Sequence, residues 1–244
     1  MTDNPRRVHI VLQGKGGVGK TYVASLLAQF YQEANRPVVC YDTDPVNSSF
    51  SAITAISARP VALFNDANEL AIAEIDRIIA EFLTAPGDVI VDNGAASFVP
   101  MSQYLIENDV SAILAEHGMQ MVLHVVITGG GMITDTLRGL LSVFDGYPPS
   151  VKVVIWHNEF FGPVVADGIT LEQMPIYRDH RDRIIGVVRL ERLNPAANGR
   201  NVLEMLDRKL TFAEAISHPD FTVVPKQRLT MVRRAIFEQV AAVV

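Results

Sequence analysis

Glycines and two lysines cluster near the start of the chain, in the segment Gly14-Lys15-Gly16-Gly17-Val18-Gly19-Lys20-Thr21. Its spacing matches the phosphate-binding pattern G-x-x-x-x-G-K-[ST]. Glycines let successive backbone N–H groups turn toward one anion, and a helix that starts at such a loop adds its own unpaired N–H groups. In this pattern Lys20 reaches the β- and γ-phosphates, and the Thr21 hydroxyl ligates Mg²⁺. The segment therefore predicts a site for a nucleoside triphosphate.

The residues on both sides of this loop supply the strand and the helix that the motif requires. An apolar run, Val8–Leu12, ends where the loop begins, and apolar residues recur at helical spacing across Lys20–Ala34. The alternative is a glycine-rich turn that matches the pattern by chance. It does not explain why a strand pattern precedes the loop and a helix pattern follows it. The candidate nucleotide contacts here are Gly14, Lys15, Gly16, Gly17, Val18, Gly19, Lys20, Thr21 and Tyr22.

Two acidic segments further along the chain could hold Mg²⁺ and orient a water molecule. In the first, the apolar run Val38–Tyr41 is followed by Asp42-Thr43-Asp44-Pro45, in which the proline would end the strand. In the second, Val89–Val91 is closed by Asp92, as in a Walker B strand. Taken alone, each aspartate is more commonly a cap at a strand-to-loop junction. Because both segments follow the phosphate loop in this order, they favour a triphosphate site with magnesium.

Short runs rich in β-branched residues recur along the chain without strict alternation, which is typical of strands buried on both faces. They are Val8–Leu12, Val38–Tyr41, Val89–Val91, Ala112–Leu114, Met121–Ile127, Val151–Trp156 and Ile184–Val188. The helical patterns are Lys20–Ala34, Ala67–Leu83, Met132–Phe144, Val202–Leu210, Phe212–Ile216 and Gln227–Val243. This alternation predicts an α/β fold: a mainly parallel β-sheet flanked by helices on both faces, with ligands at the carboxyl ends of the strands and a helical C-terminal portion.

Composition limits the class of protein. With 244 residues, 49% hydrophobic content and no long polar stretch, residues 1–244 are predicted to form a single domain. A net charge of −6 argues against a broad face for nucleic acid, although a local basic patch is compatible with it. Cys40, the single cysteine, is typical of a buried strand residue in a reducing compartment. The sequence shows neither a signal peptide nor an apolar run of ~20 residues, so we expect a cytoplasmic protein.

Three segments together resemble the deviant Walker A ATPases, the family that includes ParA and MinD. They are Lys15-Gly16-Gly17-Val18-Gly19-Lys20-Thr21, Asp42-Thr43-Asp44-Pro45 and Val91-Asp92-Asn93-Gly94. The resemblance covers roughly the first hundred residues and implies a P-loop NTPase fold of the SIMIBI class. It also implies homodimerisation on ATP binding, with Lys15 crossing the interface to contact the partner's nucleotide.

The same resemblance implies a division of labour among the site residues. Lys20 and Thr21 would hold phosphate and Mg²⁺, and Asp44 would position or activate the hydrolytic water. Asp42 would support the magnesium shell, and Asp92 would lie behind a magnesium-bound water. Lys15, Lys20 and Asp44 are thus the candidate catalytic residues, and Thr21, Asp42 and Asp92 are the candidate metal-site residues.

The chain departs from the ParA pattern at two places, which makes a transfer of DNA-partition function doubtful. Val46 stands where ParA proteins usually have glutamine, and Asp92-Asn93-Gly94 replaces a more usual serine or threonine and proline. A narrower resemblance accommodates both departures and runs nearly the whole length: the chain is similar to the TraL family of conjugative transfer regions. It is carried by Val11-Leu12-Gln13-Gly14-Lys15, the segment 42–47, the segment 92–100, and Arg228-Leu229 with Val232-Arg233-Arg234.

Three further features leave alternatives open. Guanine-specific relatives carry Asn-Lys-x-Asp where this chain has Trp156-His157-Asn158-Glu159, so adenine is favoured and Asn158 is either a base contact or a polar turn residue. The triplet Gly129-Gly130-Gly131 favours a turn over a second phosphate site. The six histidines show no metal-ligand spacing.

An apolar stripe at helical spacing runs through Leu229–Val243 at the end of the chain. A last helix packed on the core explains it best. Because MinD-like proteins use a terminal amphipathic helix at membranes, a peripheral membrane contact through this segment is the alternative. The basic residues near its start could instead form a small patch for a protein or DNA partner; they are Lys226, Arg228, Arg233 and Arg234.

These observations lead to one main function and three alternatives. The main one is an ATP-binding, weakly hydrolysing and Mg-dependent dimerisation switch in plasmid conjugative transfer, associated with type IV secretion and with a protein partner in that machinery. The first alternative is a partition or positioning ATPase that binds DNA. The second is a metabolic enzyme that activates a carboxylate with ATP, like dethiobiotin synthetase. The third is a binding module that senses ATP with negligible turnover.

Overall fold

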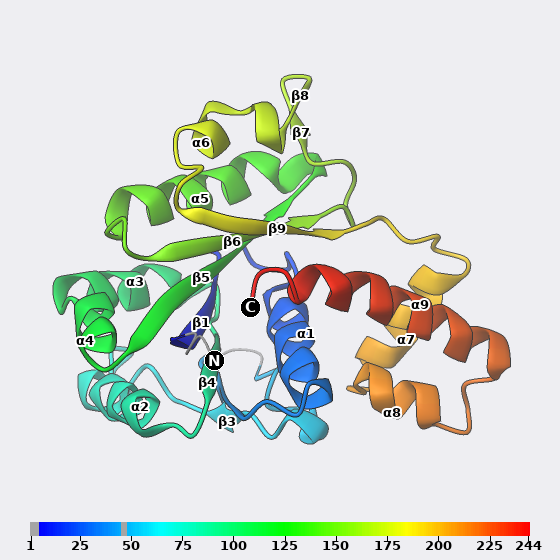
Figure 1. Cartoon of the computed structure of the whole chain (residues 1–244), viewed down its shortest axis with the longest axis horizontal. Coiled ribbons are helices and arrows are strands. Elements are labelled where there is room, and N and C mark those ends of the chain that lie inside the picture. The colour runs from blue at the N-terminus through cyan, green and yellow to red at the C-terminus, as the bar shows by residue number, and fades with distance from the viewer. Residues whose placement is uncertain (1–4, 45–47) are drawn as a thin grey trace.

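A seven-stranded sheet forms the centre of the computed structural model (Figure 1). Each of its strands pairs in parallel with its neighbours. The structure describes residues 5–44 and 48–244. The strand order is β3-β2-β4-β1-β5-β6-β9. The strands are β1 (Arg6–Leu12), β2 (Val38–Asp42), β3 (Arg59–Pro60), β4 (Asp88–Asp92), β5 (Met119–Thr128), β6 (Lys152–Asn158) and β9 (Ile184–Leu190). Because β1 lies between β4 and β5, the loop that follows it leaves the sheet near its centre, where ligands of such sheets bind.

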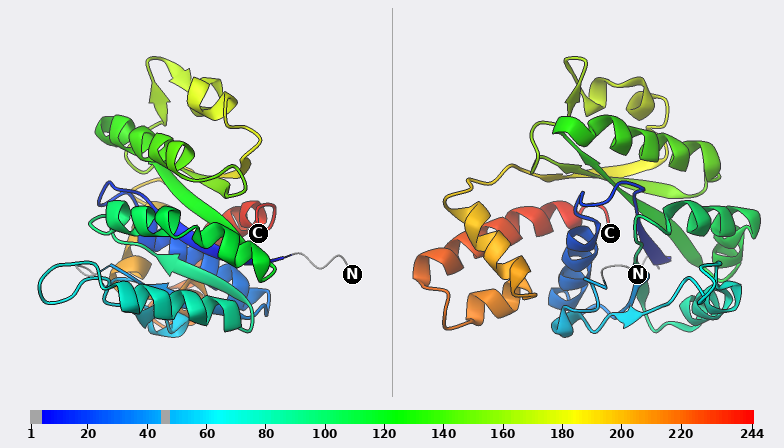
Figure 2. Two further views of the ribbon diagram at one scale, coloured as in Figure 1. Left: turned by 90° about the vertical axis from the view of Figure 1, so that its left-hand side faces the viewer. Right: turned by 180° about the vertical axis from the view of Figure 1, so that it is seen from behind.

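Helices cover both faces of the sheet (Figures 1 and 2). One face carries α2 (Ile72–Thr84), α3 (Phe98–Glu107), α4 (Val110–Glu116) and α5 (Ile133–Gly146). The other carries α1 (Lys20–Glu33), α7 (Asn198–Asp207), α8 (Phe212–Ser217) and α9 (Val223–Val240). The short elements are η1 (Thr54–Ile56), η2 (Gly130–Met132), η3 (Leu171–Gln173), α6 (Pro175–Arg178), and the hairpin of β7 (Val165–Ala166) and β8 (Ile169–Thr170). The predicted α/β class is confirmed.

The C-terminal apolar stripe packs inside the molecule. Leu229 and Val240 are fully buried, and Val232, Ile236 and Val243 are less than a tenth exposed. All five belong to the hydrophobic core on the α1 face of the sheet. The membrane contact considered for this stripe is therefore wrong for these side chains, because the core already covers them. Within the described part of the chain, no helix combines the length and the apolar character that crossing a membrane requires.

The segment Ala112–Leu114, predicted as a strand, is part of helix α4. Val110 and Leu114, four residues apart, are buried, whereas Ile113 is 37% exposed. Burial at i and i+4 is the spacing of a helix with one buried face. A short apolar run does not distinguish a buried strand from one turn of a helix, which is why the prediction failed.

Several helix boundaries also differ from the predicted ones, and the starts of α2, α7 and α9 differ most. Helix α7 begins at Asn198, four residues before the predicted Val202. The pattern that began at Ala67 gives a helix only from Ile72, because the chain before it forms an isolated bridge between Phe64 and Leu70. Helix α9 begins at Val223, four residues earlier than predicted, and contains Pro225 in its first turn. Proline is tolerated there because the first N–H groups of a helix have no partner within it.

Candidate nucleotide-binding site

The phosphate loop connects β1 to α1 and contains two glycines in the left-handed region of backbone conformation. Gly17 has φ 75° and Gly19, the residue before the helix, has φ 100°. Residues with a Cβ adopt this region at a cost, so both positions favour glycine. A Cβ at Gly16 or Gly17 would meet no described atom within 4 Å, so the space next to these two positions is open. Val18 is buried and fixes the loop to the core.

The ammonium group of Lys20 lies inside this loop. Its Nζ donates a hydrogen bond to the backbone oxygen of Lys15 at 3.2 Å, and the residue is only 8% exposed. Burial lowers the pKa of Lys20, while the carboxylates of Asp92 and Asp44 act in the opposite direction. The loop thus contains a nearly buried cation that can pair with phosphate oxygens.

Thr21 and Asp92 meet at the start of α1 and the end of β4. The Thr21 hydroxyl donates to Asp92 Oδ2 at 2.6 Å. Burial raises the pKa of Asp92 to about 7; the hydrogen bond from Thr21 opposes this rise, and the charge of Asp42 adds to it. The other oxygen, Asp92 Oδ1, is buried, and no hydrogen bond reaches it from the described residues. A buried carboxylate oxygen without a donor, beside a hydroxyl, fits Mg²⁺ and its bound water, because Mg²⁺ takes oxygen ligands.

The carboxylate of Asp42 uses both oxygens to hold the loop after β2. Oδ1 accepts from the backbone N–H of Asp44 at 3.1 Å, and Oδ2 accepts from that of Ser51 at 2.8 Å. The support that Asp42 gives to the magnesium shell therefore stays a prediction. Asp44, partly buried, lies against Gly94 in the loop after β4. Pro45, Val46 and Asn47, on which part of the sequence argument depends, lie outside the described residues.

The side chain of Lys15 forms an ion pair within its own chain. Its Nζ lies 2.8 Å from Asp135 Oδ2 in the first turn of α5, and both side chains are about two-fifths exposed. This ion pair holds the pKa of Asp135 below its usual value. Beside it lies a cavity of about 260 Å³ whose lining includes Gln13, Phe98 and Arg138. Lys15 is thus on the outer side of the loop, where it can be reached from outside the molecule.

Two side chains fix the loop to neighbouring strands, and neither belongs to the phosphate-loop motif. Gln13 Nε2 donates to the backbone oxygens of Val126 and Thr136, at 3.0 and 3.1 Å. Asn158 Nδ2 donates to the backbone oxygen of Val18 at 3.0 Å, and its Oδ1 accepts from the N–H of Phe160. Gln13 belongs to the segment that resembles the TraL family, but its role in holding the loop could not be predicted from the sequence, because that role depends on β5 and α5 lying beside the loop. The base contact proposed for Asn158 stays a prediction, since the described contacts use this residue to position the loop and its own turn.

Two other predicted features, Tyr22 and the glycine triplet 129–131, lie outside the phosphate loop. Tyr22 is partly buried against the core on the α1 face, so its contact with a nucleotide also stays a prediction. The triplet Gly129-Gly130-Gly131 forms a turn before α5. A Cβ at Gly129 would lie 2.2 Å from the backbone oxygen of Pro163, so glycine at this position allows two loops to pack closely.

Comparisons with known proteins identify relatives of this chain. A family model described as the CobQ/CobB/MinD/ParA nucleotide binding domain matches residues 9–218. Two Escherichia coli proteins named Protein TraL are 37% identical over 236 residues and 36% identical over 233 residues. These matches cover 97% and 96% of this chain, and 98% and 96% of the relatives. The solved structure of the MinD cell division protein of Aquifex aeolicus aligns with a TM-score of 0.49 and 15% identity, over 95% of this chain and 97% of that one.

The family model spans most of the chain, and the two relatives match over nearly the whole length. Both resemblances inferred from the sequence, to ParA and MinD and to TraL, are therefore confirmed. The chain belongs to the CobQ/CobB/MinD/ParA nucleotide-binding family and, within it, to the group of TraL proteins.

Proposed function

We propose that this protein binds ATP with Mg²⁺, hydrolyses it slowly, and uses the nucleotide to switch between monomer and homodimer. The observation that carries the proposal is the meeting of Lys20, Thr21 and Asp92 at an open phosphate loop that also contains Lys15. A loop lysine, a hydroxyl and a buried carboxylate are the groups that phosphate and magnesium require.

Each of these side chains has a distinct role in the proposal. Lys20 and the backbone N–H groups of the loop would hold the phosphates. Thr21 would ligate Mg²⁺, and Asp92 would bind it through one of its water ligands. A bound magnesium ion neutralises charge on the phosphate oxygens. Asp44 would orient the attacking water, and its position beside the loop after β4 supports this role.

The dimer is proposed from the position of Lys15. Its side chain is 40% exposed and, among the described residues, is paired with an exposed carboxylate, so it can leave Asp135 at small cost. A cation that arrives from a second chain would stabilise charge on the transferred phosphoryl group, as an arginine finger does. Hydrolysis would then depend on assembly.

The cellular role is proposed from the relatives. Because the curated relatives are TraL proteins, we infer that the switch acts in plasmid conjugative transfer, in the cytoplasm, with a protein of the transfer machinery as partner. The nucleotide state would decide when the protein engages that partner.

The test is the oligomeric state in the presence of ATP or ADP, measured by light scattering. Asp44→Ala is expected to accumulate as an ATP-bound dimer, and adding Lys15→Ala should return it to a monomer. Lys152→Ala provides a control, because this lysine lies at the opposite end of the sheet, where its Nζ donates to the backbone oxygen of Asp182. An Asp44→Ala protein that stays monomeric with ATP would contradict the switch.

Phosphate release separates a hydrolysing switch from a binding module. Wild-type protein should release phosphate from ATP slowly, and Lys20→Ala should release almost none. A rate that is equal in both proteins would show that this loop does not catalyse the reaction. A rate that needs a small carboxylic acid and ignores dimerisation would favour the metabolic-enzyme alternative.

A further inference from the structure

Buried hydrogen bonds join the loop after β2 to the loop after β4. The backbone N–H and the hydroxyl of Thr43 both donate to the backbone oxygen of Asp92, at 2.9 and 3.0 Å. The same hydroxyl lies 3.2 Å from Asn93 Oδ1. Thr43 and Asn93 are fully buried. The two loops that carry the acidic residues of the site are therefore connected directly to each other by buried hydrogen bonds.

Asn93 is the centre of this connection. Its Oδ1 lies 3.2 Å from the Thr43 hydroxyl and 3.1 Å from the Ser97 hydroxyl, and each hydroxyl shares its one proton between this oxygen and a backbone oxygen. Its Nδ2 donates to the backbone oxygen of Gly94 at 3.1 Å. Its own N–H donates to the backbone oxygen of Val11, at the end of the central strand. An apolar side chain here would remove the oxygen that lies between the Thr43 and Ser97 hydroxyls and the amide donor to Gly94, so the two hydroxyls would keep their backbone acceptors, Asp92 O and Gly94 O, but would lose the side chain that joins them. The polar contacts of Asn93 thus fix the course of both loops.

Gly94 determines how close Asp44 can lie to the second loop. A Cβ on Gly94 would be 2.9 Å from Asp44 Cγ and 3.0 Å from Asp44 Cα. Real Cβ atoms essentially never come so close to another heavy atom, and the Cα cannot move without the backbone. Gly94 is not among the positive-φ residues of the described chain, so space rather than backbone conformation requires glycine here.

We propose that four residues, Thr43, Asn93, Gly94 and Ser97, act as positioning residues that set the place of the Asp44 carboxylate. We call them the loop latch. This inference rests on the proposed function, in which Asp44 orients the attacking water. The latch fixes the position of Asp44 relative to Asp92. A shift of one loop would therefore shift both carboxylates.

The first test is Gly94→Ala, with Gly131→Ala as a matched control, since a Cβ at Gly131 would meet no described atom within 4 Å and its φ is not positive. Misplacing a catalytic group by about 1 Å can cost on the order of a hundredfold in rate. We therefore expect Gly94→Ala to lower kcat at least about tenfold while KM for ATP stays within about twofold. Gly94→Ala with wild-type kcat, or with ATP binding lost in proportion to kcat, would overturn the proposal.

A second pair of variants tests the hydroxyl. Thr43→Val keeps the shape of the side chain but loses the donor, and should lower kcat with little change in KM. Thr43→Ser keeps the donor and should restore most of the rate. If Thr43→Ser is as slow as Thr43→Val, the hydroxyl is not what positions Asp44.

A third measurement needs no turnover and separates failure of the latch from failure of the proposed function. Amide hydrogen exchange of Thr43 and Asp44 is followed without nucleotide, because Thr43 N–H is bonded to Asp92 and Asp44 N–H to Asp42. Gly94→Ala should speed this exchange at least about tenfold. Unchanged exchange overturns the latch whatever the enzyme does. Faster exchange in a protein that never hydrolyses ATP supports the latch and rejects the proposed activity.

Discussion

Lys15 illustrates at the residue scale how one side chain can serve two states. In the described chain it is paired with Asp135, and in the proposed dimer it must leave that partner. Because an amide holds an ammonium group less firmly than a carboxylate does, Asp135→Asn should favour the ATP-bound dimer. We expect its dissociation constant to fall about two- to fivefold, the effect of an exposed ion pair. Sedimentation over a range of protein concentrations would measure it.

The control for this prediction is Glu74→Gln, which breaks an equally exposed ion pair with Arg77 on helix α2. It should leave the dissociation constant unchanged. A weaker dimer in Asp135→Asn would mean that Asp135 orients Lys15 toward the second chain instead of retaining it.

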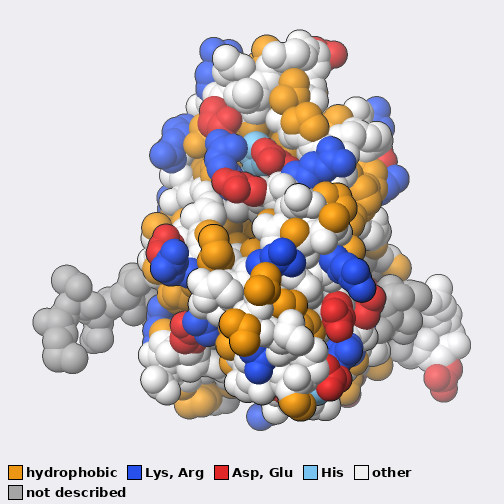
Figure 3. All heavy atoms as spheres, turned by 90° about the vertical axis from the view of Figure 1, so that its right-hand side faces the viewer, with side chains coloured by type: hydrophobic (Ala, Val, Ile, Leu, Met, Phe, Trp, Pro, Cys, Tyr) orange, Lys and Arg blue, Asp and Glu red, His pale blue; other side chains and the backbone are white. Residues whose placement is uncertain are grey.

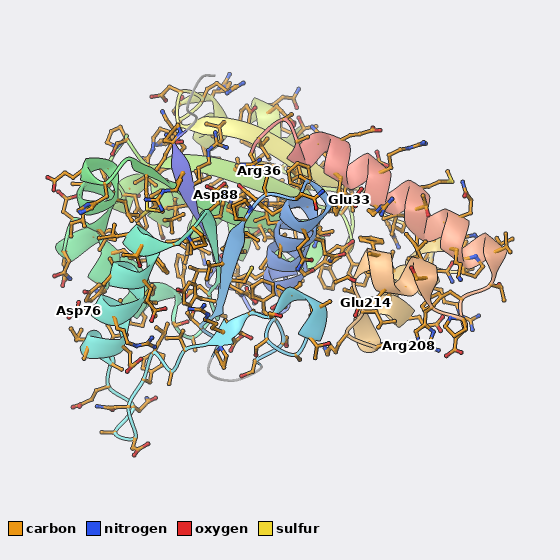
Figure 4. All side chains as sticks on the ribbon, turned by 60° about the horizontal axis from the view of Figure 1, so that its bottom comes forward. Glu33, Arg36, Asp76, Asp88, Arg208 and Glu214 are labelled. Atoms are coloured by element: carbon orange, nitrogen blue, oxygen red, sulfur yellow. The ribbon has the colours of Figure 1, made fainter. Side chains whose placement is uncertain are left out.

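A second residue-scale feature is a line of buried hydrogen bonds between the sheet and α1. Trp156 Nε1 donates to His124 Nδ1 at 2.9 Å, so the neutral His124 ring carries its proton on Nε2 and donates to His9 Nδ1, also at 2.9 Å. His9 Nε2 in turn donates to the Tyr31 oxygen, and the Tyr31 hydroxyl donates to Asp88. Asp88 also pairs with Arg36, which lies beside it at the end of the line (Figure 4). On each ring the nitrogen that accepts a hydrogen bond carries no proton, so the other nitrogen must carry it. Both histidines are therefore neutral, with the proton on Nε2.

This line predicts a pH dependence of stability. Burial lowers the pKa of His9 to about 3, with the charges of Arg7 and Arg36 adding to the effect, and burial also lowers the pKa of His124 well below its usual value. The unfolded chain takes up protons near pH 6.5 and the folded chain does not, so stability is present above about pH 6.5 and is lost as pH falls toward 3.

Each of the two histidines should contribute about 1.4 kcal/mol per pH unit to this loss. His9→Gln removes one titrating group and should lower the slope of unfolding free energy against pH by about 1 kcal/mol per pH unit between pH 5 and 6. Asp92, whose pKa burial raises to about 7, contributes a slope of opposite sign that is the same in both proteins. Urea unfolding at several pH values measures the slope, with exposed His117→Gln as control. An unchanged slope in His9→Gln would show that His9 does not remain neutral in the folded protein.

At the scale of elements, sequence patterns succeeded where they were long or carried a motif. The phosphate loop, α1, the central strands and the buried stripe of α9 could all be predicted, because period and spacing determine them. Helix α4 could not, because one apolar turn fits a strand equally well. Contacts such as that between Asn158 and Val18, 140 residues apart in the sequence, depend on strand order, which local patterns do not specify.

The packing of the chain end on the edge strand β9 gives an element-scale prediction. A Cβ on Gly186 would lie 2.2 Å from Val243 Cγ1, which is buried. Gly186→Ala should therefore push the last turn away from β9 and lower the free energy of unfolding by about 1–3 kcal/mol. Urea unfolding monitored by circular dichroism measures this cost.

Adding Val243→Ala to Gly186→Ala provides the control, because it removes the clashing methyl group. The double variant should be more stable than the sum of the two single costs predicts. Additive costs would show that Gly186 and Val243 do not compete for the same space.

At the scale of the whole molecule, the helices α7, α8 and α9 form one end, to which Figure 3 gives a direct view. Basic, acidic and apolar side chains are interspersed over this face. Three of its arginines are paired: Arg208 with Asp220, Arg233 with Glu33 and Arg234 with Glu238. With a net charge of −6 over the whole chain, this distribution suits a protein partner better than the phosphate backbone of DNA.

Whether this end folds with the sheet is the last prediction. Helices α8 and α9 share one hydrophobic core with α1 and the sheet, through residues such as Phe212, Leu229 and Trp156. Elements that bury their apolar faces against each other unfold together. Fluorescence of Trp156, the single tryptophan, reports the sheet, and hydrogen exchange of amides in α8 and α9 reports the C-terminal end. As the urea concentration rises, the fluorescence and the hydrogen exchange should give free energies of unfolding that agree within about 15%. If the C-terminal end unfolds at a clearly lower urea concentration, the protein contains two cooperative units instead of one. The surface formed by α7, α8 and α9 would then belong to a part of the protein that can unfold while the nucleotide site stays folded.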